Sequence, residues 1–337
     1  MTLAADVLDG KRRAVARALS VVENNLAGAE ELLGDLYPHT GSAHLVGVTG
    51  APGTGKSSLV NQMALTLRQQ ARTVGIIAVD PTSPFSGGAI LGDRIRMRDL
   101  SGDDGVFIRS MATRGSLGGL ARAAADAIKV LDAAGFDIIL IETVGAGQGE
   151  VDIARHAHSV IVVEAPGLGD DVQAIKAGIL EIADILVVNK SDDPRAPNTV
   201  KALRAMLDLG SQRSTRAMVN HHGRVMEAVQ SASDSNQPAG WDVPIHTTTA
   251  TDGTGIAELV NALARHRIYL IDSGELARRV RAQSASELDS LLRELLVGRL
   301  LESVDPAALA QVVEQVAARE LLPFAAARML VSELIRL

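Results

Sequence analysis

Residues 45–60 read LVGVTGAPGTGKSSLV: a short apolar run, a glycine-rich turn, then a lysine followed by hydroxyl side chains. The apolar run predicts a buried strand, and the residues from about Ser57 onward predict a helix. The turn matches the pattern G-x-x-x-x-G-K-[ST], in which backbone N–H groups surround phosphate oxygens and the helix N-terminus adds partial positive charge. The residues expected to bind nucleotide here are Gly50, Ala51, Pro52, Gly53, Thr54, Gly55, Lys56, Ser57 and Ser58. Lys56 is expected to reach the β- and γ-phosphates as a catalytic residue, and Ser57 to bind Mg²⁺ through its hydroxyl.

Short apolar runs alternate with helical patterns throughout residues 43–255. The predicted strands are 45–49, 74–79, 105–108, 137–141, 159–163, 185–188 and 243–247. Several of these are continuous apolar runs, which is typical of strands covered on both faces of a parallel sheet. We therefore predict an α/β fold, a P-loop nucleotide-binding domain over residues 43–256 with a mostly parallel central sheet flanked by helices.

Two helical regions flank this predicted domain. Residues 1–42 predict an N-terminal helical extension, because apolar side chains recur there at helical spacing. Residues 257–337 predict helices only, with starts at a Ser286/Asp289 capping box, at Asp305-Pro306 and at Pro323. The apolar stripes of these three helices would leave a large exposed patch on a monomer. Residues 257–337 are therefore predicted to form the dimerisation arm of a homodimer.

Composition excludes several classes of protein. The chain has 337 residues with 33 Lys+Arg against 40 Asp+Glu, a formal net charge of −7 and 2% aromatic residues, which disfavours nucleic acid as a partner. Zero cysteines exclude disulfides and thiolate metal sites. No membrane-spanning run and no signal peptide are recognised. A cytoplasmic protein without membrane or nucleic-acid partners is expected.

Polar residues at the predicted strand ends extend the site. Asn189, Lys190 and Asp192 follow the strand 185–188, where the Asp192 carboxylate can accept both N–H groups of guanine and Asn189 can meet the acceptor edge of the base. Glu142 ends the strand 137–141 and can hold Mg²⁺ through water, and the Gly145 N–H can sense the γ-phosphate.

Several further residues keep two interpretations. Asp80, at the end of the strand 74–79, and Asp93 could position water or Mg²⁺, or could cap a turn or helix. Gln148 could orient a water molecule or simply belong to a glycine-rich loop. Arg109 is either an anion contact or part of a surface salt bridge. The histidines, including His156 and His158, do not have the spacing of a metal site.

The chain resembles the methylmalonyl-CoA mutase-associated GTPases of the MeaB/ArgK family. The segments that carry the resemblance are Gly50–Ser57, Asp80–Ser83, Gly87–Met97, Glu142–Gln148 and Asn189–Asp192. The resemblance implies a homodimeric GTPase chaperone that binds GTP or GDP with Mg²⁺. Such a chaperone would gate adenosylcobalamin loading into methylmalonyl-CoA mutase, or a related B12-dependent mutase, and protect that enzyme.

The resemblance also implies roles for individual residues. It places Asp80, Asp93 and Glu142 in the Mg²⁺ and water shell as catalytic and metal-binding residues. It places Thr249, Ala250 and Thr251 in a guanine-binding loop, with Thr249 in place of the family's usual serine. In a further segment of the family, Asp170 and Lys176 would signal the nucleotide state to the partner.

Three other functions fit the sequence less well. An ATP-dependent small-molecule kinase conflicts with Asp192, because this carboxylate favours guanine over adenine. A metal-insertion GTPase would carry a Cys/His cluster, and a protein-targeting GTPase would carry a Met-rich domain; the sequence contains neither.

Overall fold

The computed structural model of the chain describes residues 2–80, 98–100, 102–112, 117–143, 156–167, 182–213 and 240–334. Contacts between residues divide it into two compact units, Met1–Leu276 and Ala277–Leu337, and each unit is described here by itself. No helix among the described residues is long and apolar enough to cross a membrane.

Unit 1 is built on a parallel sheet of seven strands in the order β3-β2-β4-β1-β5-β6-β7. The strands are β1 His44–Thr49, β2 Val74–Asp80, β3 Val106–Ala112, β4 Ile138–Thr143, β5 Ser159–Glu164, β6 Ile185–Val188 and β7 Ile245–Thr247. Each overlaps a strand predicted from an apolar run, which confirms the predicted α/β fold. Because all strands run the same way, the residues that follow β1, β4, β5 and β6 gather at one edge of the sheet.

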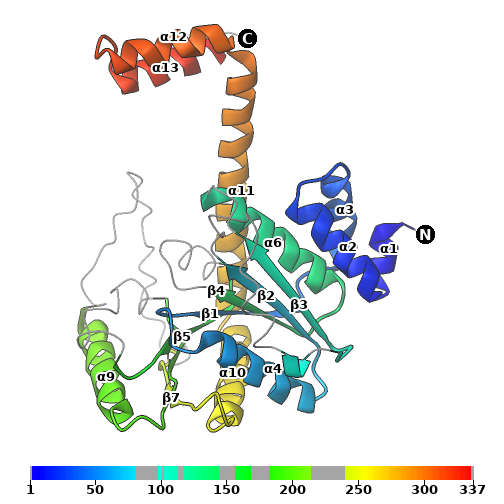
Figure 1. The fold of residues 1–337 in the computed structure, drawn as a ribbon, viewed down its shortest axis with the longest axis vertical. Coiled ribbons are helices and arrows are strands. Elements are labelled where there is room, and N and C mark those ends of the chain that lie inside the picture. The colour runs from blue at the N-terminus through cyan, green and yellow to red at the C-terminus, as the bar shows by residue number, and fades with distance from the viewer. Residues whose placement is uncertain are drawn as a thin grey trace. The chain divides into compact units, whose positions relative to one another are not determined.

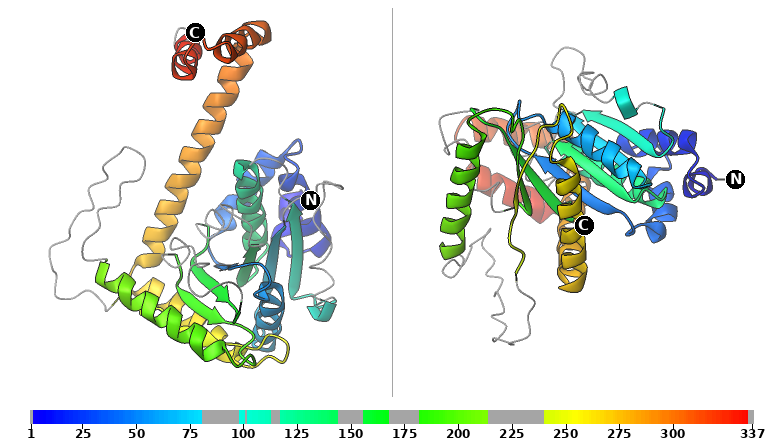
Figure 2. Two further views of the ribbon diagram at one scale, coloured as in Figure 1. Left: turned by 60° about the vertical axis from the view of Figure 1, so that its left-hand side comes forward. Right: turned by 90° about the horizontal axis from the view of Figure 1, so that it is seen from below.

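Helices cover both faces of the sheet (Figure 1). Alternate strand residues point to the two sides and are buried in separate apolar clusters. Helices α4 (Lys56–Gln69) and α10 (Ile256–Asp272) cover one face, where Val46, Leu140 and Ile161 are buried with them. Helix α6 (Leu117–Ala133) covers part of the other face, against Ile139 and Ile141. Helix α9 (Ala196–Arg213) packs on the same face over β5 and β6, as the two further views in Figure 2 also show.

The N-terminal helices extend the second face beyond α6. They are α1 Leu3–Leu8, α2 Arg12–Glu23 and α3 Ala29–Leu36, followed by the short helix η1 Tyr37–His39. Their apolar faces are buried with α6 in one cluster. The helical spacing of apolar residues in 1–42 predicts such a buried face. Arg12 donates to the Val106 carbonyl at 2.6 Å, and Arg109 forms an ion pair with Glu23. Arg109 is therefore part of a salt bridge that fastens α2 to β3.

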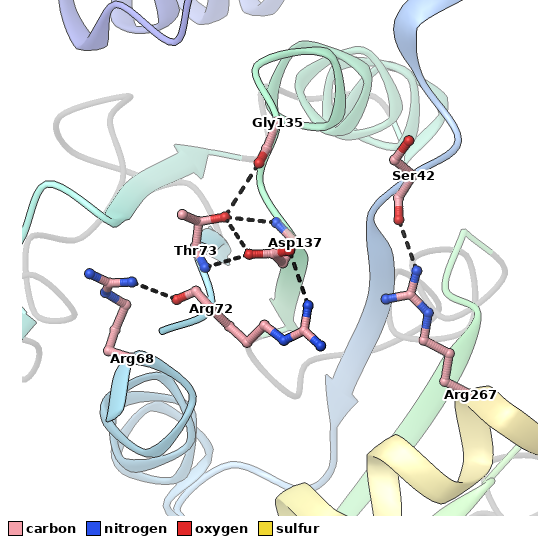
Figure 3. A network of polar contacts seen from close by, with 7 residues as sticks. All are labelled: Ser42, Arg68, Arg72, Thr73, Gly135, Asp137 and Arg267. Carbon is pink, nitrogen blue, oxygen red and sulfur yellow. Dashed lines mark hydrogen bonds and ion pairs between the residues drawn. The ribbon is translucent and has the colours of Figure 1, made fainter. Parts of the chain in front are cut away.

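A polar network fixes the ends of β2 and β4 at the edge opposite the glycine-rich turn (Figure 3). Asp137 accepts from the Thr73 backbone N–H at 2.8 Å, and the Thr73 hydroxyl lies 2.9 Å from both the Asp137 carboxylate and the Asp137 N–H. Arg72 forms an ion pair with Asp137 at 3.3 Å. Outside this network, a short helix η2 (Arg98–Leu100) precedes β3. The network adds side-chain bonds at the starts of two strands that pair along the sheet.

Unit 2 consists of helices. Its elements are α11 Glu275–Ser303, which begins at the end of unit 1, α12 Pro306–Ala317 and α13 Pro323–Leu334. Asp305 caps α12 by accepting from the Ala307 N–H at 3.1 Å, which confirms the predicted start. The predicted start at Ser286 is wrong, because α11 runs through it without interruption. Asp289 instead pairs with Arg293 one turn further along, at 2.7 Å.

Candidate nucleotide-binding site

The glycine-rich turn links β1 to α4 at the carboxyl edge of the sheet. Gly50, Gly53 and Gly55 have φ values of +143°, +81° and +90°, a region that favours glycine. A Cβ atom on Gly50 would overlap the Val163 carbonyl, and a Cβ on Gly55 would lie 2.5 Å from Asn189 Nδ2. The turn thus needs glycine both for its backbone angles and for its closeness to two neighbouring strands.

Lys56 is the first residue of α4 and is buried despite its charge, with 6% of its surface exposed. Its ammonium group donates to the Gly50 carbonyl at 2.7 Å and to the Ala51 carbonyl at 3.0 Å. A buried ammonium held by the carbonyls of a tight turn lies where it can exchange those acceptors for phosphate oxygens. The phosphate-binding role of Lys56 stays a prediction.

Ser57 and Glu142 meet beside the turn. The Ser57 hydroxyl donates to Glu142 Oε1 at 2.6 Å, and both residues are buried. Glu142 stands near the end of β4, next to β1, and Thr143 donates to the Thr49 hydroxyl across the same two strands at 3.1 Å. A hydroxyl and a carboxylate at this separation form the all-oxygen donor set that Mg²⁺ prefers.

Asn189 connects three segments at the end of β6. Its Nδ2 donates to the Thr54 carbonyl at 2.8 Å, and its Oδ1 accepts from the Thr248 hydroxyl and the Ala250 N–H, both at 3.1 Å. The side chain is 2% exposed. These bonds leave the second Nδ2 hydrogen for the predicted contact with the acceptor edge of a base.

Lys190, Asp192 and Asp193 surround the exposed side of this loop. Lys190 adopts a φ of +57° and donates to the Gly53 carbonyl at 2.8 Å, so its alkyl chain and ammonium lie along the turn. Asp192 is exposed, as a residue that recognises an incoming base must be. Asp193 instead binds Arg195 through two side-chain bonds of 3.0 and 2.7 Å, and the guanidinium lowers the pKa of Asp193 to about 2. The two adjacent carboxylates therefore have different surroundings.

Residues 249–255 close the site beside Asn189. Thr249 and Ala250 are buried and Thr251 is exposed. The Ser191 and Thr249 hydroxyls lie 3.0 Å apart, and the Ser191 N–H donates to the Thr248 carbonyl at 3.0 Å. The structure thus brings the predicted loop 249–251 against the predicted loop 189–192.

Other predicted residues lie outside the described part of the chain. They are Asp93, Gly145, Gln148, Asp170 and Lys176. Asp80 is the last residue of β2, and its side chain is not described.

Sequence reasoning missed the residues that join the loops. Thr248 and Arg195 carry no motif. The Arg195 guanidinium lies so close to Gly167 that a Cβ atom on residue 167 would overlap it. Gly167 has a φ of +75°. No sequence pattern points to Thr248 or Arg195.

Comparisons with known proteins show the family of the chain. The family model "Methylmalonyl Co-A mutase-associated GTPase MeaB" matches residues 15–305. The chain belongs to the MeaB family of GTPases. A Pyrococcus abyssi protein named as a GTPase is 45% identical over 326 residues, covering 97% of this chain and 94% of its own. The GTPase ArgK of Escherichia coli is 33% identical over 301 residues, covering 88% and 84%.

A solved structure agrees with the fold of this MeaB-family GTPase. The crystal structure of an LAO/AO transport system kinase aligns with a TM-score of 0.70 and 26% sequence identity. It covers 99% of this chain and 97% of the other. The chain is therefore a P-loop GTPase that binds guanine nucleotide and hydrolyses GTP to GDP and phosphate.

Proposed function

We propose that this MeaB-family GTPase is a chaperone for an adenosylcobalamin-dependent mutase, methylmalonyl-CoA mutase or a relative. It would use its GTPase cycle to gate cofactor loading into that enzyme and to protect it. The match of the mutase-associated family model to residues 15–305 carries the proposal. The hydrogen bonds of Asn189 support it, because they join the glycine-rich turn to the loop 249–255. A change in the bound nucleotide at the turn can therefore shift that loop and change the surface offered to a partner.

Mg²⁺ is proposed as the metal cofactor. Ser57 and Glu142 fit it, since their oxygens already lie 2.6 Å apart beside the phosphate-binding turn. When bound, Mg²⁺ would neutralise charge on the β- and γ-phosphates. Asp80 and Asp93 remain proposed members of this shell.

The described residues have separate proposed tasks in hydrolysis. Lys56 would stabilise charge on the transferring phosphoryl group, and the glycine-rich turn would donate backbone N–H groups to the phosphates. Asp192 would accept the two N–H groups that guanine presents and adenine lacks. Asp170 and Lys176 are proposed to signal nucleotide state to the mutase.

A homodimer through residues 257–337 is also proposed. Apolar side chains on α11 support it, because Leu292, Leu295 and Leu296 are 49%, 64% and 57% exposed at helical spacing. Light scattering of the full-length protein at micromolar concentration tests this proposal. A stable monomer would contradict it.

Co-purification tests the chaperone function. The chain is mixed with the apo form of its organism's B12-dependent mutase in the presence of GDP or a non-hydrolysable GTP analogue. We expect a complex and a nucleotide-dependent rate of adenosylcobalamin loading. The Lys56→Ala variant serves as the matched control. Lys56 is buried, so the variant keeps the exposed surface of the protein and loses only the phosphate-binding ammonium. Loading at the same rate with no GTPase, or with Lys56→Ala, would exclude the chaperone function.

A further inference from the structure

Asp192 lies on the exposed side of the loop that follows β6. Within the described part of the chain, its side chain forms no hydrogen bond or ion pair. A carboxylate that is to accept two N–H groups of a base must nevertheless point in one direction, because hydrogen bonds weaken steeply as their angle departs from linear. The direction of this carboxylate therefore depends on how the backbone is held before and after Asp192.

The backbone before Asp192 is held by bonds to neighbouring parts of the sheet. The Asn189 N–H donates to the Glu164 carbonyl at the end of β5, at 2.8 Å. The Ser191 N–H donates to the Thr248 carbonyl, directly after β7, at 3.0 Å. The Asn189 side chain adds its bond to the glycine-rich turn. These contacts end at Ser191, so they fix only one side of Asp192.

The backbone after Asp192 is held by a pair of side chains that closes across Pro194. The Asp193 carboxylate accepts from the Arg195 backbone N–H at 2.9 Å, from Arg195 Nε at 3.0 Å and from Arg195 Nη2 at 2.7 Å. Pro194 between them has a restricted φ, so the two ends of this closed unit move together. The two parallel side-chain bonds use the fork of N–H groups that arginine has and lysine lacks.

Main-chain bonds join this pair to the turn that contains Asp192. The Asp193 N–H donates to the Lys190 carbonyl at 3.1 Å. The Ala196 N–H donates to the Asp193 carbonyl at 2.9 Å, where α9 begins. The Arg195 and Asp193 side chains are 63% and 26% exposed, so their ion pair adds little to the stability of the protein. Its contribution is to the geometry of the turn.

The Arg195 guanidinium also lies against Gly167, which follows β5. A Cβ atom built on Gly167 would lie 2.3, 2.5 and 2.6 Å from Nη1, Cζ and Nη2 of Arg195. The guanidinium therefore occupies space that a side chain on residue 167 would need. Gly167 also has a φ of +75°, a region that favours glycine. The segments that follow β5 and β6 thus meet at Arg195.

We propose that Arg195 is a positioning residue for guanine recognition, which holds the turn of Asp192 against the segment after β5 through Asp193 and Gly167. The proposal rests on the proposed role of Asp192 in accepting the two N–H groups of guanine. Arg195 acts through the backbone of the turn and not by contact with the base. Without its guanidinium, the turn keeps its contacts on the Asn189 side and loses those on the other side, so the Asp192 carboxylate takes up a wider range of directions.

The affinities for GDP and for inosine diphosphate test this role. Inosine diphosphate keeps the ring N–H of guanine and lacks the exocyclic amine, so the ratio of the two affinities measures how well Asp192 accepts from that amine. Competition with a fluorescent GDP gives both affinities under one condition. Arg204→Ala is the matched control, because Arg204 is an exposed arginine of α9 that forms no bond within the described residues.

We expect this ratio to fall about fivefold in Arg195→Ala, equivalent to one lost hydrogen bond, and to stay at the wild-type value in Arg204→Ala. The ratio separates positioning of Asp192 from a general loosening of the domain, because loosening lowers both affinities together. A wild-type ratio in Arg195→Ala, whether or not the two affinities themselves fall, would overturn the proposal.

Arg195→Lys tests the paired geometry. It keeps the positive charge but cannot form the two parallel bonds to Asp193. We expect a ratio close to that of Arg195→Ala. A wild-type ratio would mean that the charge alone suffices, which contradicts the role of the guanidinium in holding the turn.

Gly167→Ala tests the contact with the segment after β5. The added methyl group displaces the guanidinium, so the ratio should fall by a similar factor. In the double variant with Arg195→Ala the ratio should fall no further, since the displaced group is already absent, and the backbone strain at residue 167 is the same in both backgrounds. Additive effects of the two substitutions would contradict the contact.

Failure of this proposal and failure of the proposed base site give different results. If wild type binds GDP and inosine diphosphate equally, the proposed role of Asp192 fails, and the positioning role of Arg195 fails with it. If wild type prefers GDP and Arg195→Ala keeps the full preference, only the positioning role fails.

Discussion

Replacing Asn189 with alanine should loosen the nucleotide site and destabilise unit 1. The change removes the bonds to the Thr54 carbonyl, the Thr248 hydroxyl and the Ala250 N–H. Thr54 and Thr248 are 0% exposed and Ala250 is 5% exposed, so water cannot easily replace the lost partners. A buried polar group left unpaired costs about 1–3 kcal/mol, and the costs are not fully additive, so we expect a loss of about 3 kcal/mol in the free energy of unfolding.

Urea unfolding followed by circular dichroism measures this loss, with the slope compared between variants. Asn198→Ala is the control, because Asn198 is exposed on α9 and should change stability by at most ~0.5 kcal/mol. Asn189→Asp keeps the two acceptor bonds but places a carboxylate against the Thr54 carbonyl, so it should be destabilised as well. An Asn189→Ala loss below about 1 kcal/mol would refute the role of this side chain in joining the loops.

Three further predictions concern the base, the phosphates and pH. Asp192→Asn should weaken GTP binding by about 2–4 kcal/mol, because a charge-assisted pair of hydrogen bonds to guanine is lost. Unchanged affinity in isothermal titration calorimetry would contradict the role of Asp192 in binding guanine. Glu142→Ala should lower GTP turnover and its dependence on Mg²⁺ while GDP still binds. Lys56→Ala should abolish detectable hydrolysis. Normal phosphate release by both variants would mean that the nucleotide site is wrongly assigned. Burial keeps the folded-state pKa of His44 well below 6.5, so the unfolded chain takes up the proton first and stability falls as pH decreases below about 6.5. The slope should reach at most ~1.4 kcal/mol per pH unit, and urea midpoints that stay constant between about pH 7.5 and about pH 5 would contradict it.

The strands could be predicted because their signal is local. Residues 160–163 and 185–188 are continuous apolar runs, and both faces of these strands are buried against helices. The P-loop could be predicted for the same reason, since its glycines and Lys56 are adjacent in sequence. The start of α12 followed from Asp305-Pro306, where proline fixes the first helical residue.

The Ser286 prediction failed because a capping-box pattern is not unique to helix starts. Ser286 and Asp289 lie on the exposed side of a long helix, where both side chains are tolerated and Asp289 gains an i,i+4 pair with Arg293. Nothing local distinguishes this arrangement from a cap. A real start also needs the preceding residues to leave the helix, which depends on the backbone before it.

The joining residues could not be predicted because their partners are distant in sequence. Asn189 meets Thr54 and Ala250, and His44 meets Ser159, which in turn meets His266. Such pairs are fixed by the order of strands in the sheet and by where α10 returns to it. The sequence identifies histidines and an asparagine at strand ends, but only the sheet order brings them together.

The most direct test of the central claim is the affinity of this GTPase for an adenosylcobalamin-dependent mutase, measured by biolayer interferometry in GDP and in a non-hydrolysable GTP analogue. We expect a specific complex whose affinity differs between the two nucleotides. Asp192→Asn should lose that difference at nucleotide concentrations that saturate the wild type but not the variant. Equal affinity in both nucleotides, or no complex with any such mutase, would contradict it.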